Sequence, residues 1–217
     1  MWPHYEAHRQ HKNGDRFYET PAGLLHSVTT VLSNTRDQSG LQQWREWVGE
    51  KEADLVLKTA CARGDGHHLN IEGKLLRNEE PKLTLLTRPY WKSFKPFLDQ
   101  IKKPLLCEGA VWHKDGYAGT LDCIAQLHET GDAPILLDWK TADKPKPPEG
   151  LYEYSLQCAA YVNAANYVYK NIGVEIKAAK IVIAIADDDL QIEHLDEDDL
   201  SQLYSHFHAR LTRFIKR

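Results

Sequence analysis

Residues 105–142 constrain the fold more than any other part of this sequence, because the spacing of apolar residues changes there from helical to strand-like. Polar turns divide the region into segments of strand length, which predicts a three-stranded antiparallel meander. The predicted strands are LLCEGAVWH (105–113), YAGTLDCIAQLHE (117–129) and PILLDWKTA (134–142).

Helical spacing dominates the segments on either side of the meander. The first part of the chain predicts a hairpin over 17–33 that turns through 21–23, with Ser27 or Thr29 available to begin a helix. Three further helices are predicted, from Gly40 to about Ala62, from Gly64 to Leu76, and across 82–104. After the meander, the proline-rich DKPKPPEG breaks the chain. The remaining predicted elements are a helix from Tyr152 to about Asn171, strands in 180–186 and 190–195, and a closing helix from Glu197.

This order of elements predicts an α/β fold, a single domain in which helices flank a central mixed β-sheet. No repeat, low-complexity tract or linker divides the sequence, so the domain is expected to span 1–217. It would consist of an N-terminal hairpin and helical part over 1–104, and a core sheet with its helices over 105–217. A chain of 217 residues with 42% apolar and 27% charged residues is typical of a soluble globular protein.

Targeting signals are not found in the sequence. No run approaches the roughly 18 uncharged apolar residues of a membrane span, and MWPHYEAHRQHK lacks the apolar stretch of a signal peptide. The four cysteines lie far apart without a CxxC pair, which indicates reduced core thiols. We therefore expect a cytoplasmic protein that does not bind a membrane.

The charges of the chain are unevenly distributed. The formal net charge of −4 argues against non-specific nucleic-acid binding by the chain as a whole, but residues 82–104 contain six Lys or Arg and one Asp, with four aromatic residues between them. Cations beside aromatic rings suit a single strand, whose phosphates bind charge and whose bases stack. Lys92 and Lys95 are therefore candidate DNA-binding residues. The alternative is an amphipathic helix with a solvated lysine face, which this segment alone favours.

Two acidic residues and a lysine are predicted to share one face of the last hairpin of the meander. A turn centred on Thr130 places Asp122 opposite Asp138, and opposed residues have Cβ atoms roughly 4.5–5.5 Å apart. Lys140 lies two residues beyond Asp138 and points the same way. Neighbouring carboxylates repel each other. Lys140 neutralises one of them, whereas a divalent cation such as Mg²⁺, which prefers oxygen ligands, neutralises both.

Such a metal would polarise a phosphoryl oxygen and activate water, while Lys140 orients or stabilises the attacking hydroxide. A cross-strand salt-bridge cluster on a solvated face is the alternative, and the spacing alone does not exclude it. A zinc site is excluded by spacing, because no CxxC or HxxxH pair accompanies a second such pair among the eleven histidines and four cysteines.

The run YAGTLD…ILLDWKT resembles the PD-(D/E)xK nuclease superfamily, in which an Asp on one strand precedes a D/E-x-K on the next. Within it the sequence is most similar to the RecB-like exonuclease branch, and there to the family of mitochondrial genome maintenance exonucleases and related phage and bacterial exonucleases. RGDGHH (63–68) matches the arginine-glycine-x-x-x-histidine motif of that branch, and LQCAAYVNAAN (156–166) matches its Q-x-x-x-Y helix. SVTTVLS, followed by a tryptophan-bearing helix with a GE pair, resembles its N-terminal region. The motifs occur in the expected order over about residues 17–168.

The resemblance implies a PD-(D/E)xK restriction-endonuclease-like core and a role for each matched residue. Asp122 and Asp138 would ligate the metal, with the backbone carbonyl of Trp139 as a further ligand. Lys140 would be the catalytic lysine. His68 would approach the metal or the scissile phosphate from a helix opposite, and is thus both a catalytic and a metal-site candidate.

Further candidates accompany this set. Gln157 and Tyr161 are four residues apart on one helix face and would contact the DNA backbone. Arg63, from the first motif, and Thr141, which follows the lysine, are also candidate DNA-binding residues. Glu108, in the strand before the hairpin, is a candidate acidic ligand for the metal.

Three positions in the chain limit what the resemblance implies. His67 would face elsewhere on the helix that carries the motif histidine. Asp65 stands where the family commonly has threonine. Some relatives bind an iron–sulfur cluster through one early and three late cysteines, but this chain has no cysteine after Cys158, so we expect no iron–sulfur cluster.

These observations predict a Mg²⁺-dependent DNA exonuclease, with Mn²⁺ as a substitute, that prefers single-stranded DNA or free ends in repair or recombination. No GxxxxGK[ST] motif of a helicase is present, so replication or recombination proteins are the partners expected to expose such ends. Two alternatives stay open, a structure-specific (flap) endonuclease and a non-cleaving DNA-binding module of the same fold. Degenerate members usually lose the lysine or a carboxylate, so the presence of Asp122, Asp138 and Lys140 favours activity.

Overall fold

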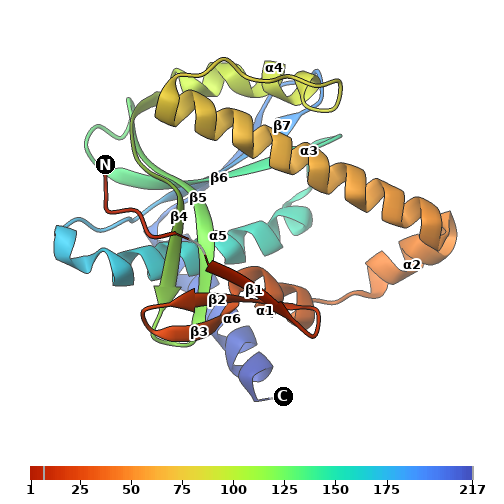
Figure 1. Ribbon diagram of the computed structural model, residues 1–217, viewed down its shortest axis with the longest axis horizontal. Helices are drawn as coiled ribbons and strands as arrows, with labels where there is room; N and C mark the ends of the chain where they lie inside the picture. Colours follow the sequence, from red (N-terminus) through yellow and green to blue (C-terminus); the bar gives the residue numbers. More distant parts are fainter. Residues whose placement is uncertain (7, 217) are drawn as a thin grey trace.

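The computed structural model describes residues 1–6 and 8–216, which form eight strands and six α-helices (Figure 1). The strands are β1 (His8–Lys12), β2 (Asp15–Thr20), β3 (Gly23–Ser27), β4 (Ile101–His113), β5 (Tyr117–Leu127), β6 (Pro134–Ala142), β7 (Ala179–Ile185) and β8 (Gln191–Leu195). The helices are α1 (Val28–Thr35), α2 (Ser39–Val48), α3 (Glu50–Arg77), α4 (Arg88–Leu98), α5 (Pro148–Val168) and α6 (Glu197–Ile215), and a 3₁₀ turn covers Lys170–Ile172.

All eight strands belong to one mixed sheet, in which β5 is shared by three neighbours. β4 pairs antiparallel along one edge of β5. The other edge of β5 pairs in two parts, parallel with β3 at Tyr117–Ala118 and antiparallel with β6 at Cys123–Gln126. β7 then pairs parallel with β6, and β8 antiparallel with β7. The predicted α/β fold with a central mixed sheet is confirmed.

Helices cover both faces of the sheet, and each face has its own hydrophobic core. In Figure 1, α3 and α4 lie above the sheet, and α5 and α6 lie below it. The core on the α5 side includes Leu136, Leu156 and Phe207, whereas the core on the α4 side includes Phe94 and Trp139. β6 is buried on both faces along Pro134–Trp139, so the polar residues at its far end are held by a rigid strand.

A two-stranded ribbon at the N-terminus was not among the predicted elements. β1 pairs with β2 around Asn13 and Gly14, whose φ angles of 53° and 84° are those of a type I′ hairpin turn. The second hairpin, which turns between β2 and β3, is the predicted one. Ser27 begins α1 as predicted, because its hydroxyl accepts the N–H of Thr30 at 2.9 Å.

The predicted break between two helices near residues 62–64 is wrong. The chain bends instead at Gly49, whose φ of 89° favours glycine, and α3 then runs on for 28 residues. Gly66 lies inside α3, where a Cβ would be 2.9 Å from the Cγ2 atom of Thr87. Glycine in this motif therefore permits close packing against the helix and does not end it.

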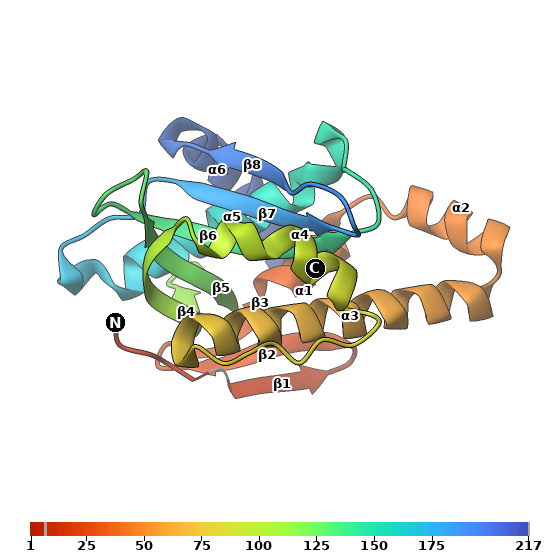
Figure 2. The same cartoon turned by 90° about the horizontal axis from the view of Figure 1, so that it is seen from above.

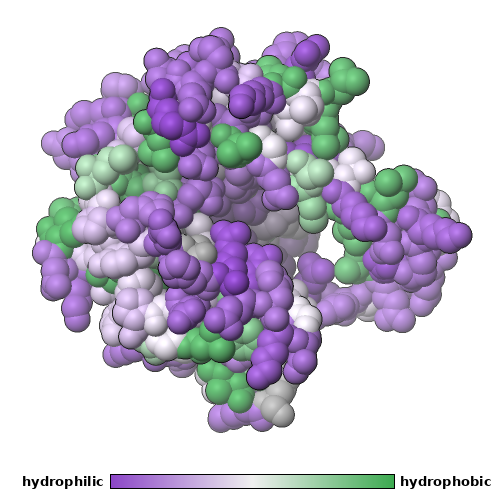
Figure 3. Space-filling model, in the orientation of Figure 1, coloured by the Kyte–Doolittle hydropathy of each residue, from purple (hydrophilic) through white to green (hydrophobic). Residues whose placement is uncertain are grey.

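α2 and the first turns of α3 form an arm that extends from the sheet (Figures 1 and 2). Trp47, Leu55 and Val56 are exposed on this arm. The space-filling view shows a hollow beneath α3 and an opening between the arm and the rest of the molecule (Figure 3). Among the described residues, the helices are all too short or too polar to cross a bilayer.

Candidate active site

The two aspartates of the D…D-x-K pattern stand where two strands separate. β5 and β6 pair as far as Cys123↔Leu137, in the register predicted from a turn centred on Thr130. Beyond that pair, β6 continues beside β7 and β5 continues beside β4. The next residues on the diverging strands are Asp122 and Asp138. The predicted opposition holds up to this fork, and the carboxylates occupy the fork itself.

Side chains replace backbone pairing inside the fork. The N–H of Trp139 donates to Oδ2 of Asp122 at 2.7 Å. Asp138 is only 1% exposed, and its carboxylate contacts the ammonium of Lys140. That ammonium also lies 5.1 Å from the ring centroid of Tyr154. Asp138 and Lys140 therefore share a face, as the strand alternation predicts.

Glu108 faces the same fork from β4. The pair directly after it, Gly109↔Leu121, places Glu108 opposite Asp122. Its φ of 50° lies in the left-handed region, which is uncommon for a residue other than glycine. Strain of this kind persists where the surrounding structure enforces it, and it is frequent at functional sites. The structure thus brings this candidate ligand into the cluster.

His68 reaches the fork from α3. Its Nδ1 atom lies 3.6 Å from Oδ1 of Asp122 and 3.7 Å from Oε1 of Glu108. Its Nε2 atom is 3.0 Å from the carbonyl oxygen of Trp139, the predicted backbone ligand. The donor atoms of His68, Glu108 and Asp122 all lie within 4.8 Å of one another. Asp138, the second predicted carboxylate ligand, is outside this group and is paired with Lys140.

Burial and nearby charges shift the pKa of three groups in the fork, His68, Asp138 and Lys140. Burial opposes a charge on His68, but the carboxylates of Asp122 and Glu108 outweigh it and raise the pKa of the ring to about 9. Burial raises the pKa of Asp138 against the opposing charge of Lys140. Burial also opposes the charge on Lys140, yet the two aspartates hold its pKa above the ordinary value. The contact with Asp138 therefore favours the charged form of Lys140.

The donor set fits a divalent cation. Oδ1 of Asp138 is buried and has no hydrogen-bond partner among residues 1–6 and 8–216, a condition that costs free energy unless another group satisfies the oxygen. Carboxylate oxygens suit Mg²⁺ or Mn²⁺, and the imidazole of His68 binds a cation once it has lost its proton. Asp122, Glu108 and His68 are the candidate ligands by distance, and Asp138 offers its free oxygen from the other side of the fork.

The fork opens into a pocket of about 460 Å³ that lies beneath α3. Gln157 and Tyr161, four residues apart on α5, line this pocket together with Asp122 and His68. Asp65, at the position where a threonine is common in the family, lines it as well. Residues predicted from three separate motifs therefore meet around one cavity, whereas Asp138 and Lys140 are not among its lining residues.

Arg63 and Thr141 contact each other and do not line this pocket. Nε of Arg63 donates to the Thr141 hydroxyl at 3.1 Å, and Nη1 donates to Asp143 at 2.7 Å and to the Tyr90 hydroxyl at 2.8 Å. The Arg63 side chain is only 12% exposed. This guanidinium ties α3 to the end of β6 and to α4, so its geometry supports a structural role more directly than the predicted contact with DNA.

Lys92 and Lys95 lie on the exposed face of α4 and outside the pocket. Nζ of Lys92 is 4.0 Å from Asp187, in the acidic turn after β7. The aromatic residues of the same helix are 5% exposed or less: Tyr90, Trp91, Phe94 and Phe97. Buried rings do not stack on bases, so the segment has the form of the alternative, an amphipathic helix with a solvated lysine face.

Four polar pocket residues near the N-terminal ribbon were not singled out by the sequence analysis. They are Arg9, Arg16, Tyr18 and Thr120. The first three lie on the β1–β2 ribbon, and the Asn-Gly turn in HKNGDR was the available signal for that ribbon. Nothing in the sequence alone indicated that the ribbon would pass over the end of β5.

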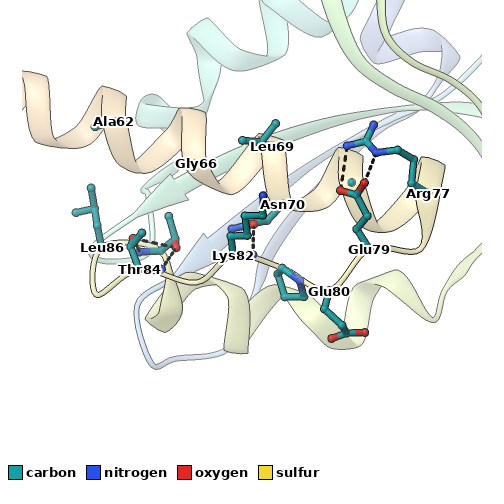
Figure 4. A pocket seen from close by; sticks show the side chains of 13 residues that line it. Ala62, Gly66, Leu69, Asn70, Arg77, Glu79, Glu80, Lys82, Thr84 and Leu86 are labelled. Carbon is teal, nitrogen blue, oxygen red and sulfur yellow. Dashed lines mark hydrogen bonds and ion pairs between the residues drawn. The ribbon is translucent and has the colours of Figure 1, made fainter.

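A second pocket, of about 410 Å³, lies between α3 and the loop 79–87 (Figure 4). Oδ1 of Asn70 accepts the N–H of Lys82 there at 2.8 Å, which fixes the loop against the helix. Leu69, which is 62% exposed, lines both this pocket and the one beneath α3. The second pocket contains none of the predicted site residues.

Histidine and cysteine predictions have mixed outcomes. His67 faces away from the fork as predicted, with its ring 5.0 Å from that of Phe94. Three cysteines are buried, but Cys61 is exposed. The prediction of a core thiol is wrong for Cys61, because this part of α3 borders the pocket and is not covered by another element.

No family model matches the sequence, but three curated proteins named mitochondrial genome maintenance exonuclease 1 are similar to it. The Xenopus tropicalis protein is 28% identical over 192 residues, which cover 82% of this chain and 53% of that protein. The human protein is 27% identical over 207 residues, covering 89% of this chain and 59% of that protein. The mouse protein is 30% identical over 204 residues, covering 88% of this chain and 59% of that protein. The chain thus spans between half and three fifths of the length of these relatives.

One solved structure supports the fold. The crystal structure of a protein from Eubacterium rectale, described as a proposed exonuclease, superposes with a TM-score of 0.50 at 13% sequence identity. The match covers 73% of this chain and 66% of that one. At this identity the likeness concerns the fold alone.

Proposed function

We propose that this chain is a nuclease of the PD-(D/E)xK type and hydrolyses phosphodiester bonds of DNA as a metal-dependent exonuclease. The observation that carries the proposal is the fork between β5 and β6, where Asp122 and Asp138 stand beside Lys140. Relatives named as exonucleases align over most of the chain, which supports exonucleolytic over purely binding activity.

Mg²⁺, or Mn²⁺ in its place, is the proposed cofactor. Asp122, Glu108 and His68 would hold it, and Asp138 would complete the set with its unpartnered oxygen. The bound cation supplies Lewis-acid polarisation of a phosphoryl oxygen and neutralises negative charge.

The side chains of the fork divide the remaining work. Lys140 would present the positive charge of its ammonium to the negative charge that develops on the phosphoryl group. Asp138 holds this ammonium in place through its direct contact. Gln157 and Tyr161 line the pocket from α5 and would bind the DNA backbone. The attacking water would enter between the lysine and the carboxylates.

A single strand or a free end is the proposed substrate. The pocket lies under α3, and the opening beside the arm adjoins this hollow (Figure 3). A flexible single strand can pass through such an opening, whereas a stiff duplex needs a wider groove. Replication or recombination proteins would expose the ends on which the enzyme acts.

The test compares linear and circular single-stranded DNA, end-labelled in turn, incubated with Mg²⁺ and separately with Mn²⁺. We expect loss of the linear strand alone, with the polarity given by the label. Lys140→Ala should abolish cleavage but retain DNA binding, while Lys177→Ala, which removes an exposed paired lysine outside the pocket, should cleave normally. Cutting of the circle would favour the flap endonuclease. If both substrates stay intact with Mg²⁺ and with Mn²⁺, the protein would be a DNA-binding module. Wild-type turnover by Lys140→Ala would refute the assignment of the lysine.

A further inference from the structure

We propose that Arg9 and Arg16, on the N-terminal β1–β2 ribbon, bind the DNA phosphate next to the scissile one and so position the strand in the fork. This inference rests on the proposed function, because it names a subsite of the same pocket. Neither arginine belongs to a motif that carries the nuclease resemblance.

The two arginines are neighbours on one face of the ribbon. Arg9 pairs with Tyr18, and His11 pairs with Arg16, so Arg9 and Arg16 are diagonal partners across the two strands. Diagonal residues are about 7–8 Å apart at Cα, within reach of long side chains. Both arginines line the pocket of the fork. Figure 1 places the ribbon below α3, and residues of both elements line the pocket.

Uncharged side chains, and not a carboxylate, hold the guanidinium of Arg9. Its Nη2 atom donates to the hydroxyl of Thr120 at 3.0 Å, and that hydroxyl donates to the hydroxyl of Tyr18 at 3.3 Å. Its guanidinium carbon lies 5.8 Å from the ring centroid of Tyr18, which is only 3% exposed. A guanidinium oriented in this way loses little freedom when it binds an anion.

Thr120 places this guanidinium beside the candidate metal ligands. Thr120 and Asp122 are two residues apart on β5, which corresponds to about 6.6–6.8 Å along one face of a strand. Through its contact with Thr120, the guanidinium of Arg9 is held two residues along β5 from Asp122, whose carboxylate faces Glu108 and His68. A strand with its scissile phosphate in the fork would carry its neighbouring phosphate toward the ribbon.

The unpaired positive charges of Arg9 and Arg16 indicate that an anion binds between them. Among residues 1–6 and 8–216, neither Arg9 nor Arg16 forms an ion pair with a carboxylate, whereas Arg63 is paired with Asp143. Two guanidiniums on one face repel each other, and a phosphate between them removes that repulsion. Planar guanidinium groups bind phosphate oxygens in bidentate fashion. The acidic side of the pocket would therefore bind the metal, and the basic side would bind a phosphate.

The first arm of the experiment compares two substrates. One is a single-stranded oligonucleotide, and the other is the p-nitrophenyl ester of thymidine 5′-monophosphate, which has one phosphodiester and no neighbouring phosphate. Arg9→Gln should lower kcat/KM for the oligonucleotide by roughly tenfold to a hundredfold, the range of one charge-assisted hydrogen bond. It should leave the ester within about twofold of wild type. Arg9→Lys should restore part of the loss, since it keeps the charge without the planar fork.

The matched control is Lys12→Gln, which removes a cation from the opposite face of the same strand. Equal losses on both substrates, or a loss no greater than that of Lys12→Gln, would overturn the proposal. Thermal unfolding of Arg9→Gln checks that the ribbon still packs.

The second arm measures binding and does not need turnover. In a Lys140→Ala background, the salt dependence of oligonucleotide binding is measured by fluorescence anisotropy, with and without Arg9→Gln. Loss of one phosphate contact should reduce the slope of log K against log salt by about 0.7; an unchanged slope would refute the contact. A wild type that cleaves neither substrate would refute the proposed function, while this arm still decides the role of Arg9.

Discussion

Gly119→Ala tests whether the position of Tyr161 in the pocket matters. A Cβ at residue 119 would lie 2.5 Å from Cε1 and 3.0 Å from the hydroxyl of Tyr161, whereas carbon atoms prefer separations of about 3.5–4.0 Å. The tyrosine is 4% exposed, and the backbone of residue 119 is fixed by its pairing with Val111. The ring would therefore have to move by about 1 Å, because neither neighbour can yield freely.

The magnitude follows from two opposing contributions. Overpacking costs about 1–3 kcal/mol, and replacing glycine by alanine in a strand returns about 0.5–1 kcal/mol. The net loss of about 1.3 kcal/mol corresponds to a Tm lower by roughly 3–5 °C for a chain of this size. A shift of about 1 Å in a positioning residue can lower the rate about a hundredfold. Expressed as free energy, the loss in kcat/KM on single-stranded DNA should therefore exceed the loss in the free energy of unfolding.

The assays are thermal unfolding and kcat/KM on a linear single strand. Tyr161→Leu in the same chain makes room for the alanine, so the double variant should be more stable than the sum of the two single changes predicts. Gly40→Ala is the matched control, because it lies on α2 with no atom within 4 Å of the added Cβ. Additive stabilities, or a Gly119→Ala variant with the Tm and rate of wild type, would refute this account of the packing.

The remaining predictions concern metal, pH and the basic helix. Asp122→Asn should raise the Mg²⁺ concentration needed for half-maximal rate while barely changing stability, since an amide oxygen can still accept the N–H of Trp139; an unchanged metal titration would contradict the ligand role. Burial lowers the pKa of His67 to about 3 from an ordinary 6.5. Between pH 6.5 and 5 only the unfolded chain therefore binds a proton at this ring. The free energy of unfolding should fall by about 2 kcal/mol over that range. His67→Leu should reduce that fall in urea unfolding, and an equal fall in both proteins would refute it. Lys92→Glu with Lys95→Glu should weaken DNA binding and its salt dependence if α4 contacts DNA; unchanged binding would assign both lysines to a solvated face.

Local patterns in the sequence were sufficient for most of the fold. The alternation along PILLDWKTA and the turn at 128–132 fix the β5–β6 register, because a slip by one residue would turn every buried side chain toward the wrong face. The same alternation fixes Asp138 and Lys140 on one side. The helix boundary was wrong because glycine was interpreted as a break, whereas Gly66 serves close packing of the loop before α4 on α3.

The sequence by itself determined the strands of the meander, the β5–β6 register and the residue types of the fork, since these depend on neighbours along the chain and on turn chemistry. Only the tertiary structure decided which distant residues meet there. The pairing of β4 with β5 brings the predicted ligand Glu108 to the fork, and the path of α3 over the sheet brings the predicted ligand His68 there. Arg9 and Arg16 reach the pocket because the N-terminal ribbon joins the sheet beside β5. Such contacts depend on how whole elements pack, and their energy is spread over many residues that no local pattern records.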